Sequence, residues 1–375
     1  MIPFNKPFFT GSETSYIEEA VKTGKISGNG VFTRKCQSFF EKKYGFLKCL
    51  LTTSCTDALE MAALLINIKP GDEVIMPSYT FVSTANAFVL RGAKIVFADS
   101  KSIHPGIDEE TIEVLITPRT KAIIPVHYAG SACDMDKIMA LANKYNLYVI
   151  EDAAQAVDGF YTVNGIQRAL GSIGHLATFS FHETKNIISG EGGMLVVNDP
   201  ELVQRAEIIW EKGTNRGQFF RGEISKYEWV DIGSSFLPSE ITAAFLWAQL
   251  ENMDKIQQRR LELWEAYDFE LQNWAEKLNI GLPMIPNYSS NNAHIFYLIC
   301  NSGVQRSALI EHLGNLGILS VFHYLSLHSS PFYSQFHDDR ILSNSDEYSE
   351  KLLRLPLFFE LNIIQVIDAL KKFNG

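Results

Sequence analysis

The sequence predicts an α/β protein with a mostly parallel sheet, helices on both faces of that sheet, and a smaller α+β domain towards the C-terminus. From about Phe46, short and nearly continuous apolar runs alternate with longer helix-like segments, which is typical of strands buried on both faces. After about Phe245 this alternation stops and a long helical pattern begins. We therefore expect a large domain over residues 1–245, including an N-terminal arm, and a small C-terminal domain over residues 246–375.

The expected elements follow one another in βα order. Strands are predicted at residues 47–51, 73–76, 94–98, 122–126, 147–150, 177–181 and 194–197, and helices at 57–66, 83–90 and 136–144. The last two of these strands are joined by a loop alone. In the small domain we expect one long helix over residues 247–274, a strand at 295–300 and a helix at 306–316.

Composition excludes several classes of function. The 375 residues carry a net charge of -10 and no long run of Lys and Arg, so nucleic acid is a poor partner. Five cysteines without a C-x-x-C pair argue against a disulfide framework and a zinc site, and we expect no metal. The N-terminus lacks the layout of a signal peptide, and no apolar run approaches the roughly 18 residues of a membrane span. We expect a soluble cytoplasmic protein.

Several candidate ligand contacts follow the predicted strands, where parallel sheets bind their ligands. After the first strand, Cys55 and Thr56 open a helix, and their free amides suit an anion, although the same residues could only cap the helix. Phe81 follows the second strand and could stack on a flat ring or pack into the core. Asp152 ends a fully apolar strand and could hold a protonated ring nitrogen or form a structural salt bridge. Gln155 could donate to a nearby oxygen.

His127 follows the predicted strand at residues 122–126, and two further histidines, His323 and His328, lie in a later segment. A single imidazole such as that of His127 is more often structural than catalytic. The segment from His323 and Tyr324 to His328 offers two imidazoles and a phenol for a polar ligand, or forms a surface loop.

Lys185 lies between an aromatic-rich strand and a glycine cluster at residues 190–193. A desolvated lysine loses its proton and attacks a carbonyl, whereas a solvated loop lysine has no such role. Taken with the helix start for a phosphate, the aromatic face and the acid, Lys185 completes the requirements of pyridoxal 5'-phosphate (PLP).

These segments together resemble one family. Residues 54–59 (SCTDAL), 77–81 (PSYTF), 125–128 (PVHY), 151–155 (EDAAQ) and 180–186 (SFHETKN) followed by GEGG are similar to the DegT/DnrJ-type sugar aminotransferases. The similarity covers nearly the whole chain. It implies a fold-type I PLP enzyme with a seven-stranded sheet, active as a homodimer with the site near the subunit interface.

The resemblance also implies roles for individual residues. Lys185 would form the Schiff base with PLP and Asp152 would pair with the pyridine nitrogen. The remaining contacts would be Gln155 to the phenolic oxygen, Phe81 to the ring face, Cys55, Thr56 and Ser180 to the phosphate, and His182, His323 and Tyr324 to the sugar. The chain departs from the family at residues 233–237 (GSSFL), where members usually have Gly-x-Asn-x-Arg. Ser235 could replace the Asn that reaches the neighbouring subunit's phosphate, but Leu237 cannot replace the Arg.

Within the family, the chain is most similar to a branch that serves enterobacterial common antigen. Residues 70–77 (PGDEVIMP), 83–92 (STANAFVLRG) and 213–216 (GTNR) carry this similarity. Members use L-glutamate to aminate C4 of TDP-4-keto-6-deoxy-D-glucose, giving TDP-4-amino-4,6-dideoxy-D-galactose and 2-oxoglutarate. The equatorial C4 epimer, C3 amination of a 3-keto isomer and an O-antigen or other glycan pathway stay open. A loop around residues 161–167, longer than this branch leads us to expect, would leave room for a different sugar pose.

Two rival functions are disfavoured. Family members that dehydrate the sugar at C3 carry a histidine where Lys185 stands. A regulatory, non-enzymatic role fits poorly with an intact lysine and no DNA-binding element.

Overall fold

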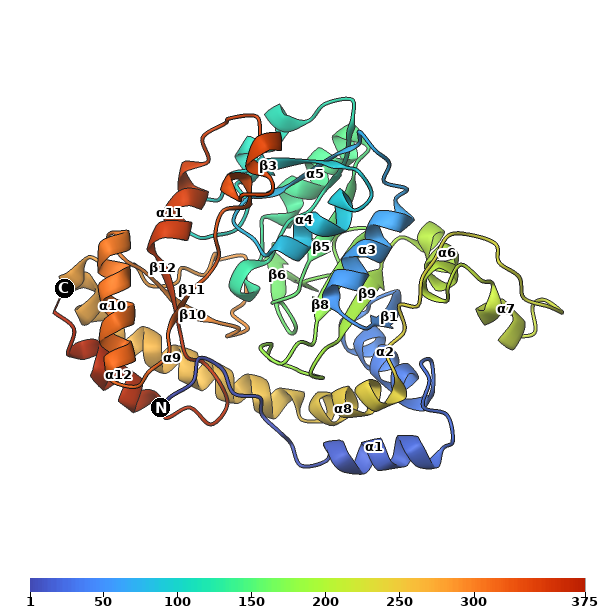
Figure 1. The fold of residues 1–375 in the computed structure, drawn as a ribbon, viewed down its shortest axis with the longest axis horizontal. Coiled ribbons are helices and arrows are strands. Elements are labelled where there is room, and N and C mark those ends of the chain that lie inside the picture. The colour runs from blue at the N-terminus through green and yellow to red at the C-terminus, as the bar shows by residue number, and fades with distance from the viewer. Residues whose placement is uncertain (375) are drawn as a thin grey trace.

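A seven-stranded sheet lies at the centre of the computed structural model, which describes residues 1–374 (Figure 1). The strands run in the order β1-β9-β8-β5-β4-β2-β3. Their bounds are β1 (Lys48–Thr52), β2 (Glu73–Pro77), β3 (Lys94–Ala98), β4 (Thr120–Ile123), β5 (Tyr148–Asp152), β8 (Leu176–Ser180) and β9 (Gly193–Val197). From β3 to β8 every neighbouring pair is parallel, and only β9 runs antiparallel to its neighbours β8 and β1. The predicted mostly parallel sheet is confirmed.

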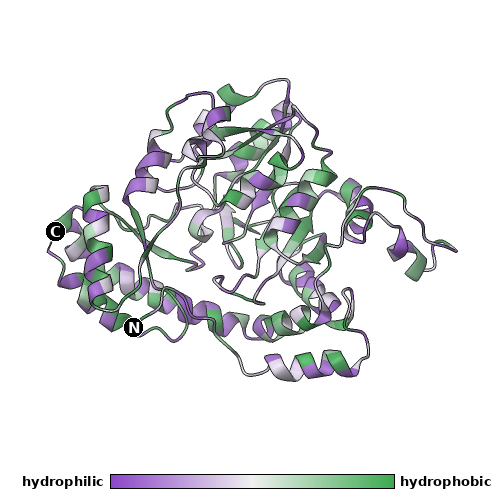
Figure 2. Ribbon diagram, in the orientation of Figure 1, coloured by the Kyte–Doolittle hydropathy of each residue, from purple (hydrophilic) through white to green (hydrophobic). Residues whose placement is uncertain are grey.

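Both faces of this sheet are buried, as the continuous apolar strands predict. One core cluster contains Val149 and the other contains Ile150, because successive side chains of a strand point to opposite faces. The first cluster includes residues of α2 (Val31–Tyr44), α5 (Met135–Tyr145) and α8 (Glu240–Glu251), and the second includes residues of α3 (Cys55–Leu65), α4 (Val82–Val89) and α6 (Pro200–Trp210). The helices show hydrophobic and hydrophilic sides in Figure 2.

A second, three-stranded antiparallel sheet forms the centre of the C-terminal region. Its order is β10-β12-β11, with bounds β10 (Phe296–Ile299), β11 (Val321–Phe322) and β12 (Leu352–Leu355). A separate core cluster joins it to α9 (Met253–Leu278), α10 (Gly303–Asn315) and α12 (Ile363–Lys371). This arrangement is the expected α+β region. Residue 245 lies within α8, so the domain division after that residue stays a prediction.

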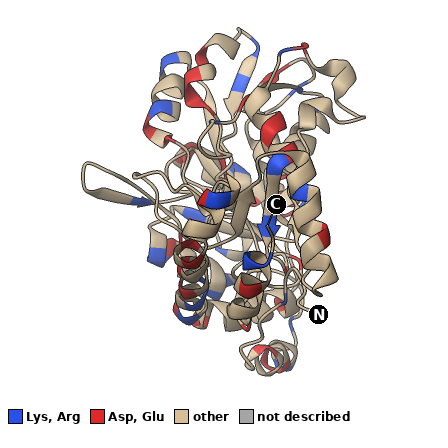
Figure 3. Ribbon diagram, turned by 90° about the vertical axis from the view of Figure 1, so that its left-hand side faces the viewer, with Lys and Arg blue, Asp and Glu red and all other residues tan. Residues whose placement is uncertain are grey.

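The remaining elements are short or peripheral. They are α1 (Glu13–Lys22), α7 (Arg216–Phe220), α11 (Ser343–Lys351) and single 3₁₀ turns at Glu109–Thr111, Glu113–Leu115, Tyr128–Gly130, Leu327–Ser329 and Ser334–Phe336. Lys and Arg are interspersed with Asp and Glu along the helices (Figure 3). No helix within residues 1–374 is both long enough and apolar enough to cross a membrane.

The single helix predicted over residues 247–274 is wrong. Two helices, α8 and α9, occupy this segment and its flanks, with Asn252 between them at φ -107° and ψ 11°. The Asn252 side chain donates to the Ala248 carbonyl (2.9 Å), which is the local side-chain-to-backbone bonding by which asparagine competes with helix. The apolar pattern continues across the break, so the sequence period alone does not reveal it.

The loop expected around residues 161–167 is a β-hairpin. Its strands are β6 (Phe160–Val163) and β7 (Ile166–Ala169), paired antiparallel. The turn residues Asn164 and Gly165 both have positive φ (53° and 76°), as a type I′ turn requires. Asn-Gly between two short strands is a strong sequence signal for such a hairpin.

Candidate active site

One cavity of about 500 Å³ lies at the carboxyl ends of β5 and β8, beside the first turns of α3 and α4. All predicted site residues line it: Cys55, Thr56, Phe81, Asp152, Gln155, Ser180, His182, Lys185, His323 and Tyr324. Because they come from positions spread over some 270 residues of chain, the fold itself brings them together. We name two groups of lining residues by the sheet that positions them. The large-sheet wall comprises Asp152, Ser180, Lys185 and the first turn of α3, and the small-sheet wall comprises His323, Tyr324 and Arg354.

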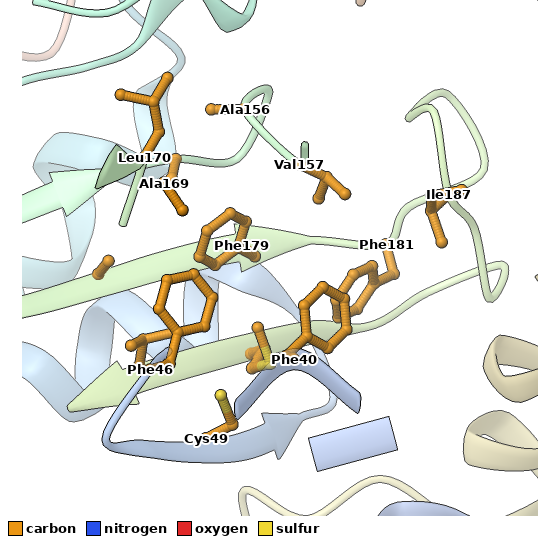
Figure 4. Close-up of a cluster of buried hydrophobic side chains, with 14 of the residues drawn as sticks. Phe40, Phe46, Cys49, Ala156, Val157, Ala169, Leu170, Phe179, Phe181 and Ile187 are labelled. Carbon is orange, nitrogen blue, oxygen red and sulfur yellow. The ribbon is translucent and has the colours of Figure 1, made fainter. Parts of the chain in front are cut away.

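Lys185 lies in the loop between β8 and β9. Its amide donates to the His182 carbonyl (2.9 Å), and the Phe181 amide donates across the loop to Gly192 (2.8 Å). Phe179 and Phe181 pack on Phe40 of α2, with ring centroids 6.4 and 5.6 Å apart (Figure 4). The strand that leads into the lysine loop is therefore anchored in the core.

Burial is the main cause that lowers the pKa of the Lys185 ammonium, to about 8, and the charge of Arg354 contributes. A substantial fraction of this amine is neutral near physiological pH. That is the form needed to attack a carbonyl.

Two neighbouring carboxylates at the end of β5 have different surroundings. Glu151 points away from the cavity, where it accepts from the His127 ring (2.9 Å) and from the amides of Gly171 and Gly174 (2.8 and 2.6 Å). Asp152 lines the cavity, is 5% exposed, and accepts from Thr84 Oγ1 (2.7 Å) and from the Ala154 amide (3.2 Å). Glu151 therefore serves the fold, and Asp152 is directed to the cavity.

The pKa of Asp152 is raised by burial, although its hydrogen bonds and the charge of Lys185 act in the opposite direction. Described residues offer this carboxylate no salt-bridge partner within 4.0 Å. A cation placed beside it would stabilise the ionised form.

The first turn of α3 leaves backbone amides free at the edge of the cavity. Ser54 caps the helix by accepting from the Asp57 amide (3.0 Å), while the first-turn amides of Cys55 and Thr56 have no partner within the helix. Gly193 permits this geometry, because a Cβ there would come within 2.4 Å of the Cys55 nitrogen. This contact gives the glycine cluster after Lys185 a structural reason.

Flat and polar groups border the rest of the cavity. Phe81 is 53% exposed, so its ring face is available for stacking. Gln155 accepts from the Ala129 amide (2.7 Å) and donates to Tyr324 OH (3.0 Å), and its side chain still has a second N–H. His182 is held by the Thr184 amide, which donates to its Nδ1 (3.2 Å).

Sequence reasoning missed several cavity residues, among them His294 and Arg354. His294 Nδ1 donates to Asn186 Oδ1 (2.8 Å), next to Lys185. Arg354 is 8% exposed and its Nη1 donates to His323 Nε2 (3.2 Å). An arginine in the apolar run Leu-Leu-Arg-Leu-Pro at residues 352–356 is costly to bury. An arginine inside an apolar run is therefore a sequence signal for a functional residue.

Other candidates lie elsewhere. His127 is fully buried against Glu151 and receives the Cys133 amide on Nδ1 (3.2 Å), which confirms the structural interpretation. His328 turns away to Ser78, with 2.7 Å between Nδ1 and Oγ, and is not part of the cavity lining. The hairpin of residues 160–169 contributes nothing to the lining either, so the expected extra room for the sugar is not found there.

The residues present fit PLP. A helix start left open by Gly193 offers amides to a phosphate, Asp152 offers a carboxylate to a pyridinium nitrogen, and Lys185 offers an amine of lowered pKa. This combination of donors, acid and amine is the one that PLP chemistry needs.

Comparison with known proteins agrees with this site. Residues 9–372 match the DegT/DnrJ/EryC1/StrS aminotransferase family. The spore coat polysaccharide biosynthesis protein SpsC of Bacillus subtilis (strain 168) is 32% identical over 385 residues, covering 99% of this chain and 95% of SpsC. DesV of S. venezuelae, solved with a ketimine intermediate, superposes with a TM-score of 0.88 at 29% identity over 100% of this chain and 99% of DesV.

A third structure, Spr1654 of Streptococcus pneumoniae in its PLP form, shares the fold at 24% identity. Its TM-score is 0.88, and the match covers 99% of this chain and 97% of Spr1654. Spr1654 has also been solved in a PMP form. The family match extends over almost the whole chain and agrees with the cavity geometry. This chain therefore belongs to the DegT/DnrJ/EryC1/StrS aminotransferase family and is a PLP-dependent sugar aminotransferase.

Proposed function

We propose that this enzyme transfers the amino group of L-glutamate to C4 of TDP-4-keto-6-deoxy-D-glucose. The products are TDP-4-amino-4,6-dideoxy-D-galactose and 2-oxoglutarate. The observation that carries an amino transfer is the pairing, in one cavity, of a lysine of lowered pKa with a buried aspartate and an open helix start. The choice of sugar follows from the sequence similarity to the C4 aminotransferase branch. SpsC, whose name assigns it to polysaccharide biosynthesis, supports a product destined for a glycan.

When bound, PLP supplies an electron sink that stabilises negative charge on the carbon bearing the amine. Lys185 is the residue we assign to the covalent bond with the cofactor. With the amino donor bound to the cofactor in its place, its Nζ would move a proton from Cα of glutamate to the cofactor carbon that carries the nitrogen, and in the second half-reaction from that carbon to C4 of the sugar. An amine with a pKa of about 8 both accepts and releases protons near neutral pH.

The other residues of the large-sheet wall hold and polarise the cofactor. Asp152, fixed by Thr84 and the Ala154 amide, keeps the ring nitrogen protonated. The first-turn amides of Cys55 and Thr56, with Ser180, hold the phosphate. Phe81 covers the ring, and Gln155 donates its free N–H to the phenolic oxygen. His182, His323 and Tyr324 contact the sugar.

We further propose a cytoplasmic homodimer with the active site near the subunit interface. Exposed apolar side chains gather on the segment between α6 and α8, where Phe220 is 66% and Trp229 is 82% exposed, and this segment projects from the body (Figure 1). Ser235 is exposed on the same segment and would donate to the partner's cofactor phosphate. Sedimentation equilibrium tests the dimer, and a mass equal to one chain would refute it.

The reaction is tested by incubating the PLP-loaded enzyme with L-glutamate and TDP-4-keto-6-deoxy-D-glucose and identifying the sugar product by NMR. We expect an axial amine at C4 and one equivalent of 2-oxoglutarate. An equatorial C4 amine would mean that Lys185 protonates the opposite face of the sugar. A C3 amine from a 3-keto isomer would mean that the substrate is that isomer. No amino sugar from either ketone would refute the proposed function.

A further inference from the structure

We propose that Arg354 binds a carboxylate of the amino donor, and so makes this site selective for an amino acid over other amines. The inference deepens the proposed function and rests on it. It starts from a buried arginine whose hydrogen-bonding capacity the protein leaves largely unused.

The position of Arg354 is fixed by the small sheet. It lies on the central strand β12, opposite Tyr297 of β10 and Val321 of β11. Its neighbours Leu353 and Leu355 point into the core of the C-terminal region, so Arg354 projects from the other face of the sheet, towards the cavity that it lines. A side chain held by two neighbouring strands is well placed to give a ligand a fixed orientation.

A comparison with Arg260, another buried arginine, shows how unusual Arg354 is. Arg260 donates from Nε to the Ala293 carbonyl (3.1 Å) and from Nη2 to the His294 carbonyl (2.6 Å). Arg354 donates from Nη1 to His323 (3.2 Å), and its buried Nε has no partner among the described residues. A guanidinium has five N–H donors. Arg354 therefore retains donors for a ligand.

The charge of Arg354 is also unpaired within the described chain. Burial lowers its pKa, and the groups that oppose this effect are tyrosines, Tyr128 first, rather than carboxylates. Phe4 of the N-terminal arm lies over the guanidinium, 4.6 Å from ring centroid to Cζ, and screens it from solvent. A buried cation without a counter-ion is costly, and an anionic ligand would offset that cost.

The chemistry of the proposed reaction leaves one source for that anion. The cofactor phosphate has its own proposed cradle at the first turn of α3, whereas Arg354 lies on β12 of the other sheet. The reacting end of the keto sugar is uncharged, because its nucleotide diphosphate is attached at C1, across the ring from C4. The amino donor brings a carboxylate to the reacting end. A planar guanidinium matches a carboxylate by two parallel hydrogen bonds.

The charges that line the cavity support this assignment. Arg354 and Lys185 are the only Lys or Arg side chains that line the described cavity. Since Lys185 is committed to the cofactor under the proposed function, Arg354 is the remaining permanent cation.

Measuring the two half-reactions separately distinguishes a role of Arg354 in binding the amino donor from a role in the reaction of the sugar. Arg354→Met and Arg354→Lys are compared with wild type and with Arg259→Met, which removes a half-buried arginine of α9 outside the cavity. The first half-reaction mixes PLP-loaded enzyme with L-glutamate, without sugar, and follows the cofactor absorbance. The second mixes enzyme loaded with pyridoxamine phosphate with the keto sugar. Binding of glutarate, a dicarboxylate that cannot react, is measured by calorimetry.

We expect Arg354→Met to lower kcat/KM for glutamate about 100-fold and Arg354→Lys about tenfold. Glutarate binding should weaken in parallel, the sugar half-reaction should fall at least about tenfold less than the glutamate half-reaction, and Arg259→Met should behave as wild type. Unchanged glutamate and glutarate binding in the folded variants would overturn the proposal, as would an equal loss in both half-reactions. If Arg354→Met does not fold, Arg354→Lys decides by the same readouts.

Failure of the proposed function gives a different result. A wild-type enzyme that does not react with glutamate refutes the proposed donor. A wild-type enzyme that reacts with glutamate but gives another amino sugar refutes the proposed acceptor and leaves the role of Arg354 standing.

Discussion

The two walls of the cavity differ in how completely the protein satisfies their polar groups. On the large-sheet wall, Asp152 has two donors from the chain, and the Lys185 loop is tied by backbone bonds. On the small-sheet wall, Nε of Arg354 and Nδ1 of His323 are buried without a partner among residues 1–374. Satisfied groups are rigid, whereas buried unsatisfied ones are costly and await a ligand. We infer that the large-sheet wall is preformed for a resident cofactor, whereas the polar groups of the small-sheet wall gain partners when a substrate binds.

The strongest test of this division removes the amine from the large-sheet wall. Lys185→Ala should lower turnover more than about 10⁴-fold, because covalent attachment and proton transfer at Cα and C4 both use Nζ. The protein should still bind pyridoxamine phosphate, which the remaining wall holds without a covalent bond. Lys94→Ala, at an exposed strand start, serves as the control. Substantial residual transamination in Lys185→Ala would assign the chemistry to another group.

The next test contrasts the two acids of β5. Asp152→Asn should lower kcat about 10³-fold in the folded enzyme, since a neutral amide does not keep the ring nitrogen protonated. Glu151→Gln should instead lower the free energy of unfolding, by about 2–3 kcal/mol, because it weakens a buried network with His127 and three amides. Steady-state kinetics per active site and urea unfolding measure the two effects. If both variants lost activity equally at equal stability, the separation of roles would be wrong.

A smaller effect, on the pH dependence of stability, tests whether Lys185 is desolvated. Folding lowers the pKa of this lysine from 10.5 to about 8, so between these values the unfolded chain binds the extra proton and stability rises with pH. Below pH 8 the buried charge costs the cofactor-free protein about 3 kcal/mol at most. Lys185→Met should therefore be more stable than wild type at pH 7, with the difference shrinking as pH approaches 10.5.

Urea unfolding of the cofactor-free proteins at several pH values measures this difference. Lys94→Met controls for loss of a lysine in general, because Lys94 is exposed. A stability difference between wild type and Lys185→Met that does not change with pH would show that the lysine is not desolvated.

The contrast between the walls also explains which parts of the structure can be predicted from the sequence. The large sheet was predictable because its strands are continuous apolar runs, and the positions of Asp152, Thr56 and Lys185 follow from the rule that ligands bind at strand ends. The helix break at Asn252 was not predicted because the apolar period continues through it. Such a break depends on one side chain's hydrogen bond rather than on the pattern.

The small-sheet wall was harder to predict for a physical reason. Arg354 reaches the cavity only because β12 pairs with two strands that are distant in the sequence. No local pattern reports such a pairing. His294 likewise depends on its contact with Asn186, 108 residues away. The sequence did indicate His323 and Tyr324 as polar candidates, but it could not separate them from His328, which faces Ser78.

The smallest expected effect tests whether the walls act separately. Tyr324→Phe removes one hydroxyl, which accepts from Gln155 Nε2 at 3.0 Å and which we propose also contacts the sugar; loss of a single neutral hydrogen bond to the sugar would cost about 1 kcal/mol. Since Tyr324 lies on the small-sheet wall, we expect roughly a fivefold rise in KM for the keto sugar and an unchanged dissociation constant for PLP. Substrate titrations and cofactor fluorescence measure the two constants. If PLP affinity fell as much as sugar affinity, Gln155 would couple the walls into one network, and their separation into cofactor and substrate sides would fail.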